Sequence, residues 1–178
     1  MGEVRDLNQR WVTLLKRGNQ AAAKQLYSMY SQAMYNTLIR ITGSQEDAKD
    51  LLQDSFVKAF SSIDQLKDDL AFGGWLKRIV VNKGIEFTRK HNNEYLEVSD
   101  MLAEPEEVDV SPSISMDVIN RKIAGLPDGC REIFTLYLVE GYTHKEISGF
   151  LGITESTSKS QYHRARKLLK ESLEQIHD

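Results

Sequence analysis

Apolar positions recur at three- and four-residue spacing along most of the chain, which is the period of α-helices that pack on one side. In the first half, this pattern predicts helices over about 7–17, 26–42, 45–60 and 72–90. Gly18 and Gly43 are placed to end the first two helices, and Ser44 is placed to cap the third. The pattern therefore predicts an all-α N-terminal domain.

The second half continues the helical pattern, with helices predicted over about 114–126, 128–139, 143–151 and 155–173. Leu138 is among the residues expected to be buried in the second of these. Thr143 and Glu146 form a capping-box pattern, and Gly152 precedes Thr154, a second candidate N-cap. A short helix, a Gly-containing turn and a long helix predict a helix-turn-helix, whose second helix enters the DNA major groove.

The charge of the 178-residue chain is −3 and is unevenly distributed. Residues 1–92 hold 14 basic and 10 acidic residues, and residues 115–178 hold nine of each. Residues 93–114 hold seven acidic residues, two prolines and no basic residue. Such a segment cannot bury enough apolar surface to offset its ordering entropy. It therefore predicts an acidic, flexible linker, and with it a domain at 1–92 and a second domain at 115–178.

Composition narrows the class of protein. At 40% hydrophobic residues the chain can form a core. No apolar run approaches the ~20 residues needed to span a bilayer, and the first residues lack the apolar stretch of a secretory signal. One cysteine, Cys130, fits a reducing compartment. A cytoplasmic protein with no membrane insertion is expected.

Two faces of the N-terminal domain carry candidate chemistry. On the third predicted helix, Asp47, Asp50, Gln53 and Asp54 lie opposite the apolar face. They are either an ordinary solvated surface or a docking face for a basic partner. The fourth predicted helix interleaves basic residues with Trp75, which suits nucleic acid because cations pair with phosphates and aromatic rings stack on unpaired bases. The alternative is that Trp75 packs in the core and the basic residues are merely solvated.

These blocks, taken together and in this order, resemble a known family. The first comprises Asp47–Phe56, Trp75–Asn82 and Arg89–Lys90; the second comprises Leu126–Pro127, Glu140–Ile147, Leu151–Thr154 and Thr157–Arg166. They look like the extracytoplasmic-function (ECF) sigma factors of bacterial RNA polymerase, over about residues 20–173. The resemblance implies two small helical domains, called region 2 and region 4. It also implies an alternative sigma factor that binds core polymerase, recognises −35 and −10 promoter elements and promotes DNA melting.

The resemblance also implies roles for particular residues. Those expected to dock on core polymerase are Asp47, Asp50, Gln53 and Asp54. Those expected to contact the −10 element are Trp75, Lys77, Arg78, Asn82, Lys83 and Arg89. Those expected to contact the −35 element are Thr157, Lys159, Ser160, His163, Arg164 and Arg166. The segment Asp64–Gly74 resembles the loop that holds a flipped −10 base.

Further expectations concern partners and departures from the family pattern. The family commonly has an anti-sigma factor as a partner, and it threads the linker toward the polymerase active-site channel. No catalytic residue, cofactor or metal is expected. Ser156, Ser158 and Gln161 stand where the family usually has Gly, Val and Arg. The lost valine is usually a packing residue, so the recognition helix is expected to sit slightly differently.

Two other classes of function stay open at this point. A two-domain repressor or activator would use the helix-turn-helix but would leave the acidic face and the Trp75 segment unexplained. A helical hydrolase or transferase lacks a nucleophile–base pair, a Gly-rich phosphate loop and a metal cluster in the sequence. A carboxylate set such as Asp47, Asp50 and Asp54 could imitate a magnesium site, but no partner carboxylates occur on another predicted helix.

Overall fold

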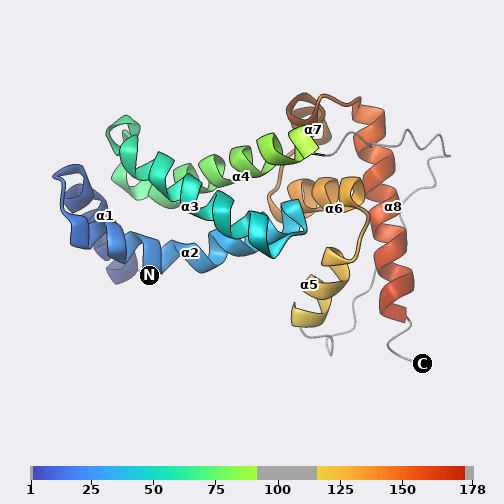
Figure 1. Cartoon of the computed structure of the whole chain (residues 1–178), viewed down its shortest axis with the longest axis horizontal. Coiled ribbons are helices and arrows are strands. Elements are labelled where there is room, and N and C mark those ends of the chain that lie inside the picture. Colours follow the sequence, from blue (N-terminus) through green and yellow to red (C-terminus); the bar gives the residue numbers. More distant parts are fainter. Residues whose placement is uncertain (1, 92–115, 175–178) are drawn as a thin grey trace. The chain divides into compact units, whose positions relative to one another are not determined.

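The computed structural model describes residues 2–91 and 116–174, and all of their regular structure is helical (Figure 1). The predicted linker, residues 93–114, lies outside this part of the chain. In the first stretch the elements are α1 (Gly2–Lys16), α2 (Gln20–Thr42), α3 (Gln45–Ser61), the 3₁₀ turns η1 (Ile63–Gln65) and η2 (Asp69–Ala71), and α4 (Phe72–His91). In the second they are α5 (Met116–Ala124), α6 (Asp128–Phe134), the π-helical turn η3 (Thr135–Val139), α7 (His144–Leu151) and α8 (Glu155–Glu174).

The predicted helix ends are confirmed where local chemistry sets them. Gly18 and Gly43 adopt left-handed backbone conformations, with φ of 79° and 72°, just after α1 and α2. The side chain of Ser44 accepts a hydrogen bond from the backbone N–H of Asp47 and so caps α3. Glycine is favoured at such positions because a Cβ atom makes the left-handed conformation costly.

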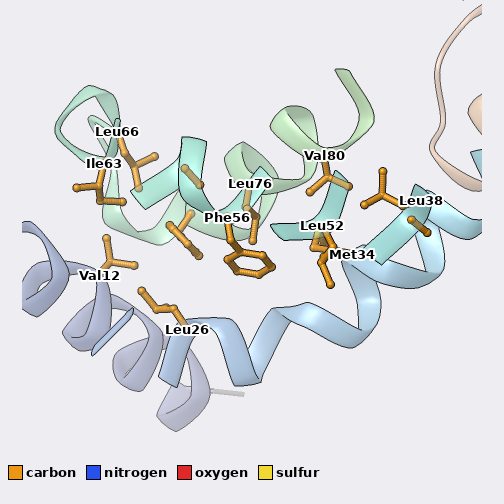
Figure 2. Packing of buried hydrophobic residues seen from close by; sticks show 13 residues of the cluster. Val12, Leu26, Met34, Leu38, Leu52, Phe56, Ile63, Leu66, Leu76 and Val80 are labelled. Atoms are coloured by element: carbon orange, nitrogen blue, oxygen red, sulfur yellow. The ribbon is translucent and has the colours of Figure 1, made fainter. Parts of the chain in front are cut away.

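Contacts divide the chain into two units, one of residues 1–39 and 44–86 and the other of residues 40–43 and 87–178. The first unit has a core built from α1, α2, α3, the η1 turn and α4 (Figure 2). Phe56 lies within this core, and Val12, Leu26 and Leu76 are fully buried in it. The burial of one face on each helix is what the three- and four-residue periodicity predicts.

The second unit contains its own core, formed mainly by residues of α5, α6 and α8. Ile123, Phe134, Ala165 and Leu169 belong to it, together with Cys130. The ring of Phe134 stacks on that of Tyr162, with centroids 6.0 Å apart. The fold class is therefore confirmed: an all-α protein with two small helical domains.

One predicted core residue is wrong. Leu138 is 57% exposed, because the helix predicted over 128–139 ends at Phe134 as an α-helix and continues as the π turn η3. The backbone N–H of Glu140 donates to the carbonyl of Thr135, five residues back. The wider turn shifts the angular position of each following residue, so the α-helical period no longer identifies the buried ones.

Candidate functional site

The predicted acidic face lies on the open side of α3. Ala48, Leu52, Ser55, Phe56 and Ala59 form the buried side of that helix. On the opposite side, Asp50, Gln53 and Asp54 are exposed and Asp47 is half-exposed. Within the first unit, this face is therefore exposed and open to a binding partner.

An apolar residue belongs to this face and is missed by sequence reasoning. Val57 is 63% exposed and follows Gln53 by one helical turn. Its exposure could have been found by extending the acidic positions along the helix, since residue 57 continues the spacing of residues 50, 53 and 54. An exposed branched side chain among carboxylates gives the face both an apolar and an electrostatic component.

The residues predicted to contact the −10 element are all on α4, but they do not share one face. Because each residue turns the helix by about 100°, Trp75, Arg78, Asn82 and Arg89 fall on one side. Arg78, Asn82 and Arg89 are exposed on that side. Lys77 and Lys83 are half-exposed and flank it, each more than about 100° from its middle. Nucleic acid lying along the first face would meet four of the six.

Trp75 packs in the core and is also partly exposed. Its ring packs against the core of the first unit and lies 6.2 Å from the ring of Phe72. It is nevertheless only half-buried. Core packing therefore fixes the position of the indole while part of its surface stays exposed.

The predicted base-holding loop, Asp64–Gly74, is partly helical. Its last three residues form the first turn of α4, and η1 and η2 occupy part of the rest. Leu66 and Phe72 are buried, whereas Lys67, Asp68 and Leu70 are exposed. The loop is thus anchored at two apolar points with an open stretch between them.

The predicted helix-turn-helix is confirmed in its geometry. The side chain of Thr143 accepts from the backbone N–H of Glu146, and the Glu146 carboxylate accepts from the backbone N–H of Thr143, which completes the capping box of α7. Gly152 ends α7 with φ of 69°. The hydroxyl of Thr154 then accepts from the backbone N–H of Thr157 at 3.0 Å and caps α8.

The two sides of α8 have different chemistry. Its buried residues are Ser158, Gln161, Ala165 and Leu169, which lie on one side. The residues predicted to contact the −35 element all lie off that side: Thr157, Lys159, Ser160, His163, Arg164 and Arg166 are half-exposed or exposed. Ser156 and Lys167, both exposed, continue the same surface.

Two contacts shape the charge on this surface. Lys159 Nζ lies 2.9 Å from a carboxylate oxygen of Glu155, one turn earlier, and this ion pair holds the pKa of Glu155 below its ordinary value. The guanidinium of Arg166 lies over the ring of Tyr162, 5.9 Å from its centroid, in a cation–π contact. The Lys159 ammonium is therefore paired with Glu155, and the Tyr162 ring orients the Arg166 guanidinium.

The departures from the family pattern at Ser158 and Gln161 fall on the buried side. Ser158 is fully buried, with its hydroxyl 2.9 Å from Nδ1 of His144. Gln161 is almost fully buried, and its side-chain oxygen accepts from the Cys130 thiol at 3.0 Å. These residues thus change how α8 is attached to its own unit, rather than the surface that faces outward.

Metal clusters and membrane spans are not found among the described residues. Within residues 2–91 and 116–174, no three His, Cys, Asp or Glu side chains lie close enough together to hold a metal ion. The helices in the same stretches include none long and apolar enough to cross a bilayer.

Comparison with known protein families matches both units. The family model for sigma-70 region 2 matches residues 26–94, and the model for sigma-70 region 4 matches residues 116–169. Sigma factors are transcription regulators rather than catalysts, and they bind core RNA polymerase and promoter DNA.

Among characterised relatives, the chain is 30% identical over 177 residues to the ECF RNA polymerase sigma factor SigW of Bacillus subtilis, covering 91% of this chain and 94% of that protein. It is 32% identical over 150 residues to the ECF sigma factor SigM of the same organism, covering 82% of this chain and 91% of the relative.

Two solved structures share the fold. One is CnrH in complex with the cytosolic domain of CnrY, with a TM-score of 0.51, 22% identity and coverage of 94% of this chain and 97% of that one. The other is the sigma factor RpoE in complex with the anti-sigma factor NepR from Bartonella quintana, with a TM-score of 0.51, 24% identity and coverage of 87% and 98%. With the sequence matches over both units, the chain belongs to the ECF sigma factors, the alternative sigma subunits that direct promoter recognition in transcription initiation.

Proposed function

We propose that the two units of this sigma factor read two parts of the promoter: the region 2 unit docks on core polymerase and binds the −10 element, and the region 4 unit binds the −35 element. The observation that carries this division is the arrangement of α8. Its buried residues lie on one side, and the hydroxyl, imidazole and cationic side chains predicted to contact the −35 element lie off it. A capped turn precedes this open surface, as in helices that enter the major groove.

At the −35 element, the first turns of α8 face the base edges. Thr157 and Ser160 can donate to or accept from bases, and Lys159 and Arg164 can donate to guanine or to phosphate. Arg166 lies further along the helix and is oriented by the Tyr162 ring. We assign it to the phosphate backbone, where contacts fix register without reading sequence.

At the −10 element, α4 holds the unpaired strand. Flipping a base out of the duplex costs a few kcal/mol in lost stacking and pairing. Stacking on an aromatic ring returns about 1–3 kcal/mol per base. The half-exposed ring of Trp75 supports this role, with Arg78, Asn82 and Arg89 lying along the same side for backbone contacts. Lys77 and Lys83 contribute from the flanks.

Docking on core polymerase uses the open face of α3. Asp47, Asp50, Gln53 and Asp54 supply carboxylates and an amide for basic and polar groups, and Val57 supplies an apolar contact. Protein–protein interfaces combine apolar contacts with a polar rim. Val57 adds an apolar contact to the carboxylates and the amide, and the match to sigma-70 region 2 over residues 26–94 supports docking over a merely solvated face.

We further propose that an anti-sigma factor restrains the protein in the cytoplasm. RpoE of Bartonella quintana is bound to an anti-sigma factor in its solved structure. We place the region 2 domain at residues 1–92 and the region 4 domain at residues 115–178, joined by the acidic linker, although contacts group residues 40–43 and 87–91 with the second unit. No catalytic residue or cofactor is assigned to the chain.

Run-off transcription tests the proposal. The chain is added to core RNA polymerase on a library of genomic fragments from its own organism. Promoter-specific transcripts that share two sequence elements at −35 and −10 spacing are expected. Transcripts identical to those from core polymerase alone would contradict the proposal.

A matched variant separates a sigma factor from a free-standing regulator. Asp50→Arg/Asp54→Arg leaves α8 intact but reverses two charges on the α3 face. It is expected to abolish transcription, and the wild-type chain is expected not to shift promoter duplexes in a gel without polymerase. A strong shift by the chain alone, unaffected by the double variant, would favour a repressor or activator.

A further inference from the structure

The loop between α3 and α4 is held in place by contacts with other elements of the first unit. Leu66 and Phe72 anchor it in the core of the first unit, but the intervening Lys67, Asp68 and Leu70 are exposed, and Leu70 is 53% exposed. One contact within the loop is the hydrogen bond from the backbone N–H of Leu70 to the Asp68 carboxylate, at 3.0 Å. The backbone N–H groups of Ala71 and Phe72 also donate, to the carbonyl oxygens of Asp68 and Asp69, and these bonds form the short turn η2. All of them join near neighbours in the chain, so several conformations of the loop as a whole remain open to it.

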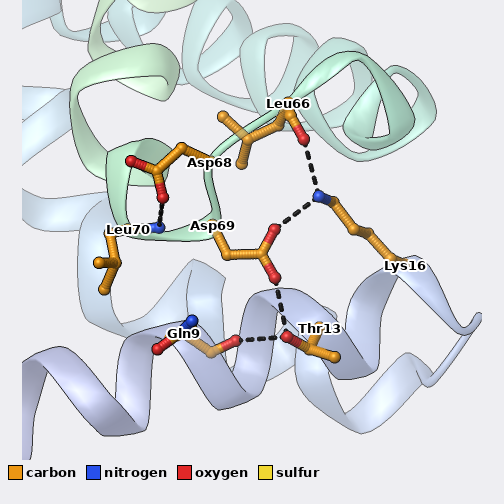
Figure 3. Close-up of polar contacts among 7 residues, drawn as sticks. All are labelled: Gln9, Thr13, Lys16, Leu66, Asp68, Asp69 and Leu70. Atoms are coloured by element: carbon orange, nitrogen blue, oxygen red, sulfur yellow. Dashed lines mark hydrogen bonds and ion pairs between the residues drawn. The ribbon is translucent and has the colours of Figure 1, made fainter.

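Contacts from α1 restrict that choice (Figure 3). Lys16 Nζ lies 2.5 Å from Asp69 Oδ1 and donates to the carbonyl oxygen of Leu66 at 2.7 Å. The Thr13 hydroxyl lies 2.8 Å from Asp69 Oδ2 and 3.0 Å from the carbonyl oxygen of Gln9. Both oxygens of Asp69 are therefore engaged by α1, and Lys16 bridges the start of the loop at Leu66 and its middle at Asp69.

The position of this cluster makes it stronger than a surface ion pair. The side chains of Lys16 and Asp69 are only 26% and 18% exposed. Partial burial raises the pKa of the Asp69 carboxyl, but hydrogen bonds from Lys16 and Thr13 and the Lys16 charge outweigh it and leave the pKa below its ordinary value. Charge-assisted hydrogen bonds that are shielded from water keep more of their strength than exposed pairs do.

We propose that Lys16 and Thr13 are positioning residues for −10 recognition: through Asp69 they hold the loop over residues 66–71 in one conformation before DNA arrives. The proposal rests on the proposed −10 function of the region 2 unit, and on the family resemblance by which the loop of residues 64–74 holds a flipped base. A loop that becomes ordered only when it binds loses conformational entropy at each residue, and this loss weakens binding. A loop that is ordered in advance avoids that loss. Neither Lys16 nor Thr13 needs to touch DNA for this effect.

The test uses holoenzyme and single-stranded oligonucleotides that carry the non-template −10 strand of a promoter found by run-off transcription. Each base is replaced in turn by an abasic site. In wild type, one position is expected to weaken binding strongly, and it marks the base held by the loop. In Lys16→Met, binding of the intact strand should weaken about tenfold, while binding of that abasic strand should not change.

The ratio of these two affinities distinguishes positioning from general destabilisation. A merely structural role would weaken both strands alike and leave the ratio unchanged, which would overturn the proposal. Asp69→Asn should reduce the ratio like Lys16→Met, and the double variant should do no more than either. Lys16→Arg should largely restore the ratio. Lys24→Met is the matched control, because it removes one positive charge from an exposed site on α2.

Hydrogen exchange of the free chain gives a readout without DNA. Lys16→Met should speed exchange of the amides over residues 66–71 and leave those of α3 unchanged. Unchanged exchange in the loop would overturn the proposal. If wild-type holoenzyme bound every abasic strand as well as the intact one, the proposed −10 function would fail and this inference with it. If wild type preferred the intact strand to the abasic one and Lys16→Met kept the same ratio of affinities, this inference alone would be overturned.

Discussion

Nδ1 of His144 lies 2.9 Å from the hydroxyl oxygen of Ser158, which joins the first residue of α7 to the fourth residue of α8. The imidazole also stacks on the ring of Tyr137, with centroids 4.2 Å apart. The two helices of the helix-turn-helix are thus connected by a partly buried polar contact. The angle between them is set partly by this bond, not by apolar packing alone.

Removing the Ser158 hydroxyl should weaken the region 4 unit. Ser158→Ala leaves Nδ1 of His144 without this partner, so we expect the free energy of unfolding to fall by about 1–2 kcal/mol. Urea unfolding of the full chain, followed by circular dichroism, measures the change. Ser156→Ala is the matched control, since Ser156 is exposed on the same helix. Equal stability of the two variants would contradict the prediction.

The His144 imidazole should also make the stability of the folded chain depend on pH. Burial lowers the pKa of His144, as do the nearby charges of Lys159 and His163, although Glu155 opposes them. Because the folded pKa is below the unfolded one, the unfolded chain binds the proton more readily. Stability should therefore be complete above about pH 6.5, the ordinary histidine pKa, and should fall as the pH drops below it.

Unfolding free energies at pH 7.5 and 5.5 measure this loss. His144→Gln cannot titrate at that position, so its stability should change less between the two pH values than that of wild type. The other histidines are the same in both proteins and cancel in the comparison. A wild type that lost no more stability than His144→Gln on acidification would refute the prediction.

The ion pair between Lys159 and Glu155 should limit DNA binding. Glu155→Gln releases the ammonium for phosphate or guanine and removes a negative charge near the DNA, so promoter affinity of the holoenzyme should rise several-fold. Lys159→Ala should lower it. In the Lys159→Ala background, Glu155→Gln should have a much smaller effect. Filter binding at two salt concentrations measures both affinity and the number of phosphate contacts.

The α3 face should tolerate neither charge reversal nor loss of its apolar residue. Asp50→Arg and Val57→Glu should each weaken binding to core polymerase by about tenfold or more, without lowering the stability of the free chain, since both residues are exposed. Fluorescence titration of labelled chain with core polymerase measures this. Asp64→Arg makes the same charge change at an exposed site on η1 and should bind normally.

Cys130 should be inert in the folded protein. It is fully buried, and burial raises the pKa of its thiol even though the charge of Arg164 opposes the shift. Because the thiolate is the reactive form, a thiol reagent should modify the native chain at least a hundredfold more slowly than the chain in urea. It is the only cysteine, so the signal reports one site. Rapid labelling under native conditions would contradict the burial.

Local signals account for the features that the sequence predicts well. The ends of α7 and α8 follow from Thr143, Gly152 and Thr154, each of which acts on residues within one turn of itself. The open faces of α3 and α8 follow from helical periodicity, which holds while the helix keeps its geometry. Where η3 replaces that geometry, as at Leu138, the same periodicity fails.

Contacts between distant segments account for what the sequence does not predict. Lys16 and Asp69 are 53 positions apart, and nothing in the pattern around either residue points to the other. Ser158 and Gln161 depart from the family pattern, but their effect depends on whether they face DNA or the core. Their partners, His144 and Cys130, come from other helices. Only the folded chain brings these pairs together.

The separation of the two sides of α8 has a consequence for how promoter choice can change. In the proposed role of α8, substitutions at Ser156, Ser160 or Lys167 would alter what the helix presents to DNA without replacing the buried residues that attach it to its unit. Selection, or an engineer, can thus retarget the protein to new promoters in small steps. Each intermediate keeps a folded region 4, so the path between two specificities need not pass through an unstable protein.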